Sequence, residues 1–185
     1  MVTKTLVGFS GGVESTSLMK YLLLETDDLL QVVHIYCNDS RNRAQWEWAA
    51  VQRLLPELRK IRDFQFSRVD ISFPMDLWDP EVQCTVLPGL MRGYECHRFM
   101  RGLNIEDIYP SGRHENRDRL VQWTNFWLKW PLDSNISPDL PMFYWPKKQH
   151  MDYISEYLPL TFSCLYPKHD GAACMKCRTC LLREY

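Results

Sequence analysis

The sequence predicts an α/β protein with a Rossmann-like parallel sheet, helices on both faces of that sheet and a cysteine-rich loop at the C-terminal end. Two observations predict this fold class. Short β-rich apolar runs alternate along the chain with segments in which apolar residues recur every three or four positions. Four cysteines then gather in the last part of the chain. Strands that alternate with helices form right-handed βαβ units, and the parallel sheet that results is covered on both faces.

The composition excludes several classes of protein. Of the 185 residues, 45% are hydrophobic and 24% are charged, as in folded globular domains. The formal net charge of −1 predicts no general binding of nucleic acid, because such binding relies on an excess of Lys and Arg. No apolar run approaches the ~20 residues that span a bilayer, and the first residues lack the pattern of a secretory leader. We therefore expect a cytoplasmic protein without membrane contact.

The first part of the chain shows the alternation most clearly. Turn-forming residues follow each apolar run, as in Ser10-Gly11-Gly12 and Asn38-Asp39-Ser40. The predicted elements are a strand over Lys4–Phe9, a helix from Val13, a strand over Gln31–Tyr36, a helix over Ala44–Lys60 and a strand over Phe64–Ile71.

The second part of the chain is richer in proline. Residues 72–93 are predicted to form an extended loop, and loops of this length inside a domain are usually functional. The further predicted elements are a helix over Leu90–Leu103, a strand over Ile105–Tyr109, a helix over Arg117–Trp130 and a short helix over Lys148–Tyr157. An aromatic stripe on the third of these, at Trp123, Phe126, Trp127 and Trp130, is typical of a core or of a homodimer interface. We expect residues 1–158 to form one domain, with residues 159–185 packed on it as a metal-binding segment.

The loop between the first strand and the first helix is the first candidate site. Gly11 and Gly12 let the backbone approach an anion without obstruction by a Cβ atom. The N–H groups at the start of the helix favour a phosphate, and the side chains of Ser10 and Ser15 add hydroxyl donors. The sequence matches neither GxxxxGK[ST] nor GxGxxG. The alternative interpretation is a plain Gly-Gly turn in which Ser15 caps the helix.

The second candidate site is a set of four cysteines, Cys164, Cys174, Cys177 and Cys180. Four thiolates complete a tetrahedral Zn²⁺ site, and the polar character of the segment argues against buried free thiols. A closed site of this kind leaves no position for a substrate, so we expect a structural role. An iron–sulfur cluster is the alternative, because four cysteines also hold such clusters.

The segment Ser10-Gly11-Gly12-Val13-Glu14-Ser15 resembles the SGGxDS loop of the PP-loop ATP pyrophosphatases, whose sheet is of the adenine nucleotide α-hydrolase type. This resemblance implies that the chain binds ATP with Mg²⁺. Glu14 stands where the family has aspartate, so the carboxylate for Mg²⁺ is kept but lies one methylene further from the backbone. The residues that the resemblance assigns to the phosphates are Ser10, Gly11, Gly12, Val13, Ser15 and Thr16.

The loop and the cysteines together resemble the 7-cyano-7-deazaguanine synthase family, over nearly the whole chain. The matching segments are Tyr36, Leu87-Pro88-Gly89, Ser111-Gly112, Trp145-Pro146-Lys147-Lys148 and Ser163-Cys164-Leu165-Tyr166. The resemblance implies that Tyr36, Ser111 and Gly112 line the nucleotide site. It also implies that Pro88 and Gly89 contact the substrate and that Lys148 binds phosphate oxygens.

The acceptor pocket departs from the family pattern. Leu90 and Met91 replace the family's Arg-Asn pair, with Arg92 just beyond, and the segment after Ser111-Gly112 is shortened. Arg92 remains a candidate for substrate binding. Arg113 or Arg117 could hold an acceptor carboxylate through two hydrogen bonds, and the alternative for both is an exposed charge at the start of a helix.

The resemblance implies an ATP-dependent C–N ligase that adenylates a deazapurine carboxylate, uses ammonia and forms a nitrile, with Glu14, Lys148 and Arg117 in the catalytic set. A second hypothesis is a PP-loop enzyme that adenylates another acceptor, either a protein carboxylate or a tRNA base that then receives sulfur. For the tRNA reaction the cysteines would be working thiols. A third is an inactive nucleotide-binding module.

Overall fold

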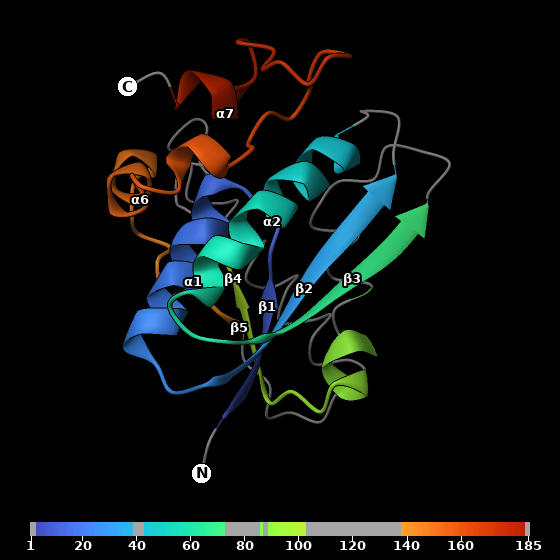
Figure 1. Cartoon of the computed structure of the whole chain (residues 1–185), viewed down its shortest axis with the longest axis vertical. Coiled ribbons are helices and arrows are strands. Elements are labelled where there is room, and N and C mark those ends of the chain that lie inside the picture. The colour runs from blue at the N-terminus through green and yellow to red at the C-terminus, as the bar shows by residue number, and fades with distance from the viewer. Residues whose placement is uncertain (1–2, 39–42, 73–85, 87–88, 103–137, 184–185) are drawn as a thin grey trace, which may run out of the picture.

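The computed structural model in Figure 1 describes residues 3–38, 43–72, 86, 89–102 and 138–183. Strands and helices alternate through the first part of the chain, as the periodicity predicts. The strands are β1 (Lys4–Gly8), β2 (Leu29–Asn38), β3 (Gln65–Ser72), β4 (Arg98–Arg101) and β5 (Pro138–Asp139). The helices are α1 (Val13–Glu25), α2 (Ala44–Arg59), α6 (Lys147–Tyr153), the 3₁₀ helix η1 (Leu158–Leu160) and α7 (Arg178–Leu181).

The five strands form one sheet in the order β3-β2-β1-β4-β5, and every neighbouring pair is parallel. The chain runs from the central strand β1 outward to β3 and then returns to the other side of β1 with β4. The strand order therefore reverses between β1 and β4. In open α/β sheets, ligands bind at the carboxyl ends of the strands at such a reversal.

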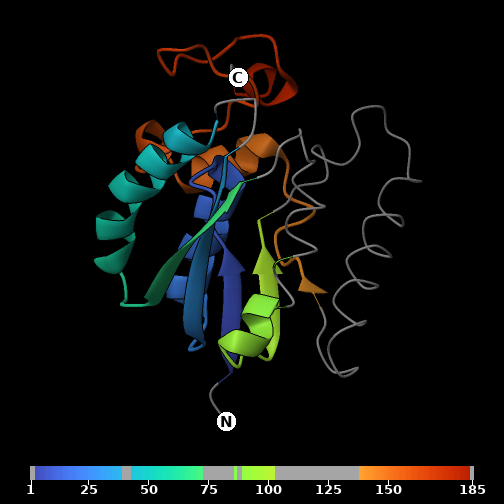
Figure 2. The ribbon, with the colours of Figure 1, turned by 90° about the vertical axis from the view of Figure 1, so that its right-hand side faces the viewer.

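One face of the sheet is covered by α1 and α2. The alternation of side chains along β1 and β2 turns Val7 and Val32 toward these helices, where they join a core with Leu18 of α1 and Val51 of α2. Pro56 lies inside α2. Figure 2 shows α2 on one side of the sheet and the helical turn at residues 89–93 on the other. The prediction of a parallel sheet with helices on both faces is confirmed.

On the opposite face of the sheet, one predicted element is wrong. The helix expected over Leu90–Leu103 is a short turn at residues 89–93, followed by β4. Glu95 adopts a left-handed conformation with a φ of 54°, and the N–H of Cys96 donates to the carbonyl of Met91, which together end the helix. Met91 then packs against Phe99 of β4 in a second core cluster. The end of the predicted loop over residues 72–93 is thus helical.

The remaining predictions divide into those that the structure describes and those that it does not. The strands predicted over Lys4–Phe9, Gln31–Tyr36 and Phe64–Ile71 and the helix over Ala44–Lys60 are present within a few residues. The short helix expected over Lys148–Tyr157 begins at Lys147 and ends at Tyr153. The strand over Ile105–Tyr109, the helix over Arg117–Trp130 and its aromatic stripe lie outside the described residues. Among the helices that are described, none has the length and apolar character needed to cross a bilayer.

Candidate nucleotide loop and cysteine centre

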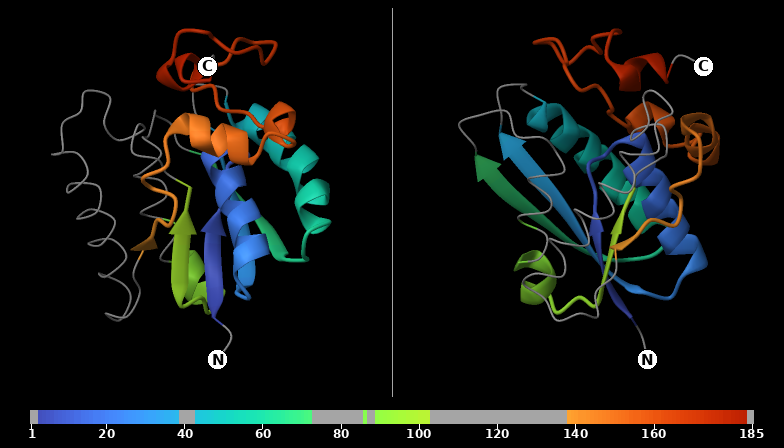
Figure 3. Two further views of the ribbon diagram at one scale, coloured as in Figure 1. Left: turned by 90° about the vertical axis from the view of Figure 1, so that its left-hand side faces the viewer. Right: turned by 180° about the vertical axis from the view of Figure 1, so that it is seen from behind.

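The two candidate sites lie at the same end of the molecule. The strands point toward the end where the C-terminal segment lies, as Figures 1 and 3 show from several sides. The loop from Ser10 to Gly12 follows β1 at this edge and leads directly into α1. It therefore occupies the carboxyl end of the central strand, beside the reversal of strand order.

Gly11 gives the loop its shape. Its φ of +75° lies in the left-handed region that side chains other than glycine rarely adopt. A Cβ atom there would stand 3.1 Å from side-chain atoms of Ala50 and Val51 in α2. The backbone of the loop is thus pressed against α2, and both the conformation and the space require glycine at this position.

Hydroxyl groups gather around the start of α1. The Ser10 Oγ lies 3.1 Å from the Ser15 Oγ and accepts a hydrogen bond of 3.3 Å from the N–H of Gly12. Thr16 donates from its side chain to the Gly12 carbonyl over 2.8 Å, which fixes the first turn of the helix. The N–H of Val13 points to the Ser163 Oγ at 3.4 Å. Because these hydrogen bonds are long, the N–H groups of Gly12 and Val13 are bound only weakly by the hydroxyls. An anion can therefore replace the hydroxyls as the acceptor.

Glu14 lies in the first turn of α1 and forms an ion pair with Lys147 at the start of α6. Burial alone would raise the pKa of Glu14, but the Lys147 ammonium outweighs this effect and holds the pKa below its usual value. Lys148, which the family resemblance assigns to the phosphates, is exposed, whereas its neighbour Lys147 is buried. The structure therefore brings Lys147, and not Lys148, to the loop.

The end of β4 also touches this turn. A Cβ atom on Gly102 would come within 2.5 Å of the backbone of Glu14 and Ser15. Backbone cannot move aside as the tip of a side chain can, so glycine is needed here for strand and helix to approach. Sequence reasoning missed Gly102, which lies in no motif, and chose Lys148 over Lys147 within the segment Trp145-Pro146-Lys147-Lys148, because only the fold brings Gly102 and Lys147 to the loop.

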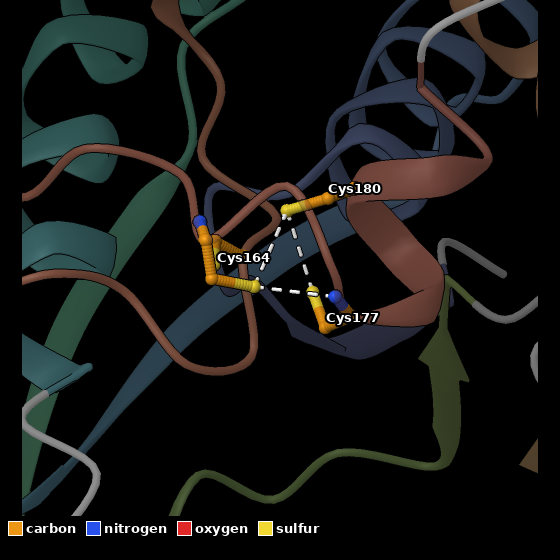
Figure 4. A group of neighbouring side chains, drawn as sticks. Cys164, Cys177 and Cys180 are labelled. Atoms are coloured by element: carbon orange, nitrogen blue, oxygen red, sulfur yellow. Dashed lines mark hydrogen bonds between the residues drawn. The ribbon is translucent and has the colours of Figure 1, made fainter.

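The four cysteines come together at the C-terminal end of the chain, above the loop. Their sulfur atoms all lie within 4.8 Å of one another, with 3.4 Å between Cys177 and Cys180 and 3.9 Å between Cys174 and Cys180. Figure 4 shows the sulfurs of Cys164, Cys177 and Cys180 pointing toward one another. Cys177 immediately precedes α7 and Cys180 lies within it, so this short helix sets the distance between the two.

Backbone N–H groups point at these sulfurs. Cys164 accepts from the N–H of Cys174 at 3.3 Å, Cys174 from that of Cys177 at 3.2 Å, and Cys177 from that of Leu165 at 3.5 Å. Burial raises the pKa of Cys177, but the adjacent Thr179 hydroxyl and hydrogen bonds from backbone N–H groups outweigh it and lower the pKa to about 6. Burial and the neighbouring Cys177 sulfur raise the pKa of Cys180 to about 12. Four sulfurs this close become thiolates together only around a cation.

The donor set fits a metal centre. A tetrahedral ion with metal–sulfur bonds of ~2.3 Å holds its sulfurs ~3.8 Å apart, close to the distances between these sulfurs. The N–H groups supply the outer hydrogen bonds that stabilise bound thiolates. The cysteines are therefore arranged to bind a metal.

The cysteine centre is attached to the loop through the residues that precede Cys164. The N–H of Phe162 donates to the Gly11 carbonyl over 2.9 Å, and Ser163 accepts from the N–H of Val13. The prediction of a purely structural centre did not foresee this contact. The residue pattern gives no signal for it, because 150 residues separate Ser163 from Val13.

A group of aromatic rings lies at the carboxyl end of β2. The ring of Trp48 from α2 stacks on His34 with 5.5 Å between centroids, and the guanidinium of Arg68 lies 4.1 Å from the centroid of the Tyr36 ring. His34 is buried, its Nδ1 donates to the Phe9 carbonyl over 2.9 Å, and burial lowers its pKa to about 4. Tyr36 thus stands on the strand next to the loop, in contact with a cation.

The other site residues predicted from the sequence divide into two groups. Gly89 and Arg92 belong to the turn at residues 89–93, at the end of the sheet away from the loop, so the structure does not bring them to it (Figure 2). The predicted residues that lie outside the described part of the chain are Pro88, Ser111, Gly112, Arg113 and Arg117.

Comparison with known proteins places the fold among solved structures. No family model and no curated protein matches the sequence. A solved structure that matches is the U34-tRNA thiolase NcsA from Methanococcus maripaludis with its [4Fe-4S] cluster. The TM-score is 0.58 at 12% identity, over 87% of this chain and 58% of the thiolase. The chain thus spans less than two thirds of the length of that protein, with which it shares its α/β fold.

Proposed function

We propose that the chain is a PP-loop enzyme that binds ATP at the loop from Ser10 to Thr16 and activates an acceptor by adenylation. The observation that carries this proposal is the loop itself. It combines the left-handed Gly11, weakly held N–H groups at Gly12 and Val13 and the hydroxyls of Ser10 and Ser15, at the carboxyl end of the central strand. Backbone N–H groups and a helix N-terminus in this arrangement suit a pyrophosphate.

In this reaction an oxygen of the acceptor attacks the α-phosphorus of ATP, the bond to the bridging oxygen breaks, and pyrophosphate leaves. The chain's own contribution is to position the phosphates and to offset their charge. The N–H groups of Gly12 and Val13 would hold the departing pyrophosphate, and the buried Lys147 would supply a positive charge beside it.

Mg²⁺ enters this proposal with the nucleotide. Glu14 already accepts a hydrogen bond from Lys147, so a dication on the same carboxylate would stand next to a buried ammonium. The phosphates of ATP offset this repulsion because they bring negative charge to the same place. We therefore infer that Glu14 binds Mg²⁺ only when the nucleotide is present.

The acceptor that we favour is a tRNA base that receives sulfur after its activation. The support is the fold shared with a U34-tRNA thiolase and the presence of four cysteines beside the loop. The exposed Lys168 and Lys176 lie in the same cysteine segment and offer a local positive charge to a phosphate backbone.

A second candidate is the formation of a nitrile from a deazapurine carboxylate and ammonia. The observation that favours it is the spacing of the cysteine sulfurs, which suits one tetrahedral Zn²⁺ ion closed by four ligands. In a four-iron cluster each sulfur binds a different iron, so the sulfurs stand further apart. The spacing therefore favours Zn²⁺ over a four-iron cluster, and the metal content of the purified protein tests this.

Two measurements test the proposal. The first is release of AMP from ATP, with tRNA and a sulfide donor in one reaction and 7-carboxy-7-deazaguanine and ammonium in another. We expect tRNA-dependent AMP release, which the Ser15→Ala variant lowers at least tenfold and the exposed Ser155→Ala control leaves unchanged. The second is the metal content with the visible absorption spectrum, since Zn²⁺ is colourless and an iron–sulfur cluster absorbs. The proposal is contradicted if neither reaction releases AMP, or if the protein does not bind ATP.

A further inference from the structure

We propose that Ser163 is a positioning residue of the nucleotide loop and that the metal-loaded cysteine centre sets its position, so that metal and nucleotide bind with positive coupling. The inference rests on the proposed binding of ATP at this loop. It goes beyond that function because it assigns to the cysteine centre a role in nucleotide affinity, carried by named contacts between the two sites.

The first step runs from the loop to the cysteine segment. The N–H of Phe162 donates to the carbonyl of Gly11 over 2.9 Å, which fixes the left-handed residue of the loop. The Ser163 Oγ lies 3.4 Å from the backbone nitrogen of Val13, which donates to it. A Cβ atom on Gly12 would lie 3.4 Å from the Phe162 carbonyl oxygen, so this segment packs directly on the loop.

The second step runs from Ser163 to the cysteines. Ser163 precedes Cys164, one of the four ligands, and its carbonyl accepts a hydrogen bond of 2.5 Å from the Thr179 hydroxyl. Thr179 lies between Cys177 and Cys180 in the chain, and its Oγ1 is 3.2 Å from the Cys177 Sγ. The backbone of Ser163 is therefore held from two sides by residues that a metal would fix in place.

A third set of contacts holds the start of the same segment. The guanidinium of Arg183, just beyond α7, donates to the Leu158 carbonyl over 3.0 Å and to the Thr161 Oγ1 over 2.8 Å. Residues 158–164 are thus attached at both ends to α7 and its flanks. Because α7 carries Cys180 and follows Cys177, closing the four thiolates around an ion orders this whole stretch.

The energetic consequence follows from linkage. Without metal, Cys164 and Thr179 lose their fixed separation, and Ser163 and Phe162 hold the loop less firmly. Nucleotide binding must then itself order the loop, and the lost conformational entropy lowers the affinity for the nucleotide. If bound metal raises the affinity for the nucleotide by some factor, bound nucleotide raises the affinity for the metal by the same factor. Couplings of this kind are typically about 5- to 150-fold, and we expect about tenfold here.

The test uses the full chain in two states, loaded with Zn²⁺ or stripped with a chelator, and a non-hydrolysable ATP analogue. We expect the dissociation constant of the analogue, measured by calorimetry, to be about tenfold higher in the stripped protein. Competition with a chromogenic chelator then measures Zn²⁺ affinity with and without the analogue, and the same factor is expected. Equal affinities in the two states would overturn the proposal.

Variants separate coupling from overall stability. Ser163→Ala keeps the four cysteines, so we expect it to bind Zn²⁺ as the wild type does but to lose most of the coupling. Thr179→Val removes the hydroxyl between Cys177 and Ser163 and should do the same. Ser155→Ala, an exposed position away from the loop, is the matched control and should retain the full factor. Full coupling in Ser163→Ala would contradict the role given to Ser163.

Amide hydrogen exchange distinguishes failure of this inference from failure of the proposed function. We expect amides of residues 11–16 to exchange more slowly in the Zn²⁺-loaded chain than in the stripped chain, without any nucleotide. If the loaded chain shows this protection but binds no analogue, the proposed function fails and the link between the sites stands. If the analogue binds and protection is the same in both states, the link fails.

Discussion

Lys147 and Glu14 form an ion pair that ties the first turn of α6 to the first turn of α1. The ammonium of Lys147 donates to the Glu14 Oε1, and the side chains are 2% and 12% exposed. Few pairs in the described residues are as well shielded from water. The pair stands beside the loop from Ser10 to Gly12, so its charge balance belongs to the candidate site as well as to the fold.

Replacement of Lys147 should be far more costly than replacement of its neighbour. Lys147→Met leaves the Glu14 carboxylate buried without its main partner, and we expect a loss of about 3 kcal/mol in the free energy of unfolding. The matched control is Lys148→Met, at an exposed position, which should change stability by less than about 0.5 kcal/mol. Urea unfolding measures both. The double variant Glu14→Gln, Lys147→Met should recover part of the loss, and equal stabilities for the two single variants would argue against the pair.

Acid should destabilise the protein through His34 before most carboxylates are protonated. Burial lowers the pKa of His34 from 6.5 to about 4 in the folded chain. Between these values the unfolded chain takes up a proton that the folded chain refuses, so stability falls as the pH falls. The slope from this group is up to about 1.4 kcal/mol per pH unit.

The measurement is urea unfolding at intervals from pH 7 to pH 4, for wild type and His34→Asn. The variant lacks the titrating ring, so its stability should decline less steeply over this range even if its absolute stability is lower. His97→Asn, at an exposed position, provides the matched control. A slope in His34→Asn as steep as that of the wild type would show that His34 is not the group responsible.

Gly102 should tolerate no side chain. The Cβ of Gly102→Ala would lie 2.5 Å from the backbone of Glu14 and Ser15, so strand and helix must separate. We expect a loss of about 2 kcal/mol in stability and weaker binding of an ATP analogue. Gly93→Ala is the control, because no described atom lies within 4 Å of its Cβ position and residues 89–93 are helical. That variant should be as stable as the wild type or up to ~1 kcal/mol more stable, as thermal unfolding would reveal.

Removal of metal should lower stability, because folding assembles the ligands of the cysteine centre. With free Zn²⁺ at about 100 times the dissociation constant, the bound ion contributes about 3 kcal/mol. We expect this difference between loaded and chelator-treated protein. Cys180→Ser should lose both the ion and the difference, whereas Cys37→Ser, outside the centre, should keep them. Identical unfolding curves with and without chelator would show that the metal centre does not contribute to the free energy of unfolding.

The strands and helices of the first 72 residues were predictable from local pattern. Each β-rich run there ends in a turn signal, and α2 shows apolar residues at helical spacing, so local and tertiary preferences agree. Prediction failed at Leu90–Leu103, where Leu90, Met91, Phe99 and Met100 suit a helix as well as a strand. The left-handed Glu95 decided between them, and nothing in the sequence marks a glutamate for that conformation.

The candidate site was predictable in its motifs and unpredictable in its contacts. The four cysteines were recognisable from their spacing, and the loop from its resemblance to the SGGxDS loop of the PP-loop ATP pyrophosphatases. Which of two adjacent lysines reaches Glu14 depended on the phase of α6, and Lys147 turned inward where Lys148 was expected. The contact between Ser163 and Val13 depended on tertiary packing, which no local pattern encodes.

Gly11 is contacted by Val51 and accepts a hydrogen bond from Phe162, two residues that the ribosome makes at very different times. Val51 is present early, but the N–H of Phe162 that satisfies the Gly11 carbonyl is made much later. A nascent chain can therefore pair β1, β2 and β3 while this loop still lacks its last partner. Contacts so distant in sequence form slowly, and this loop should consequently be among the last parts of the described fold to reach its final conformation.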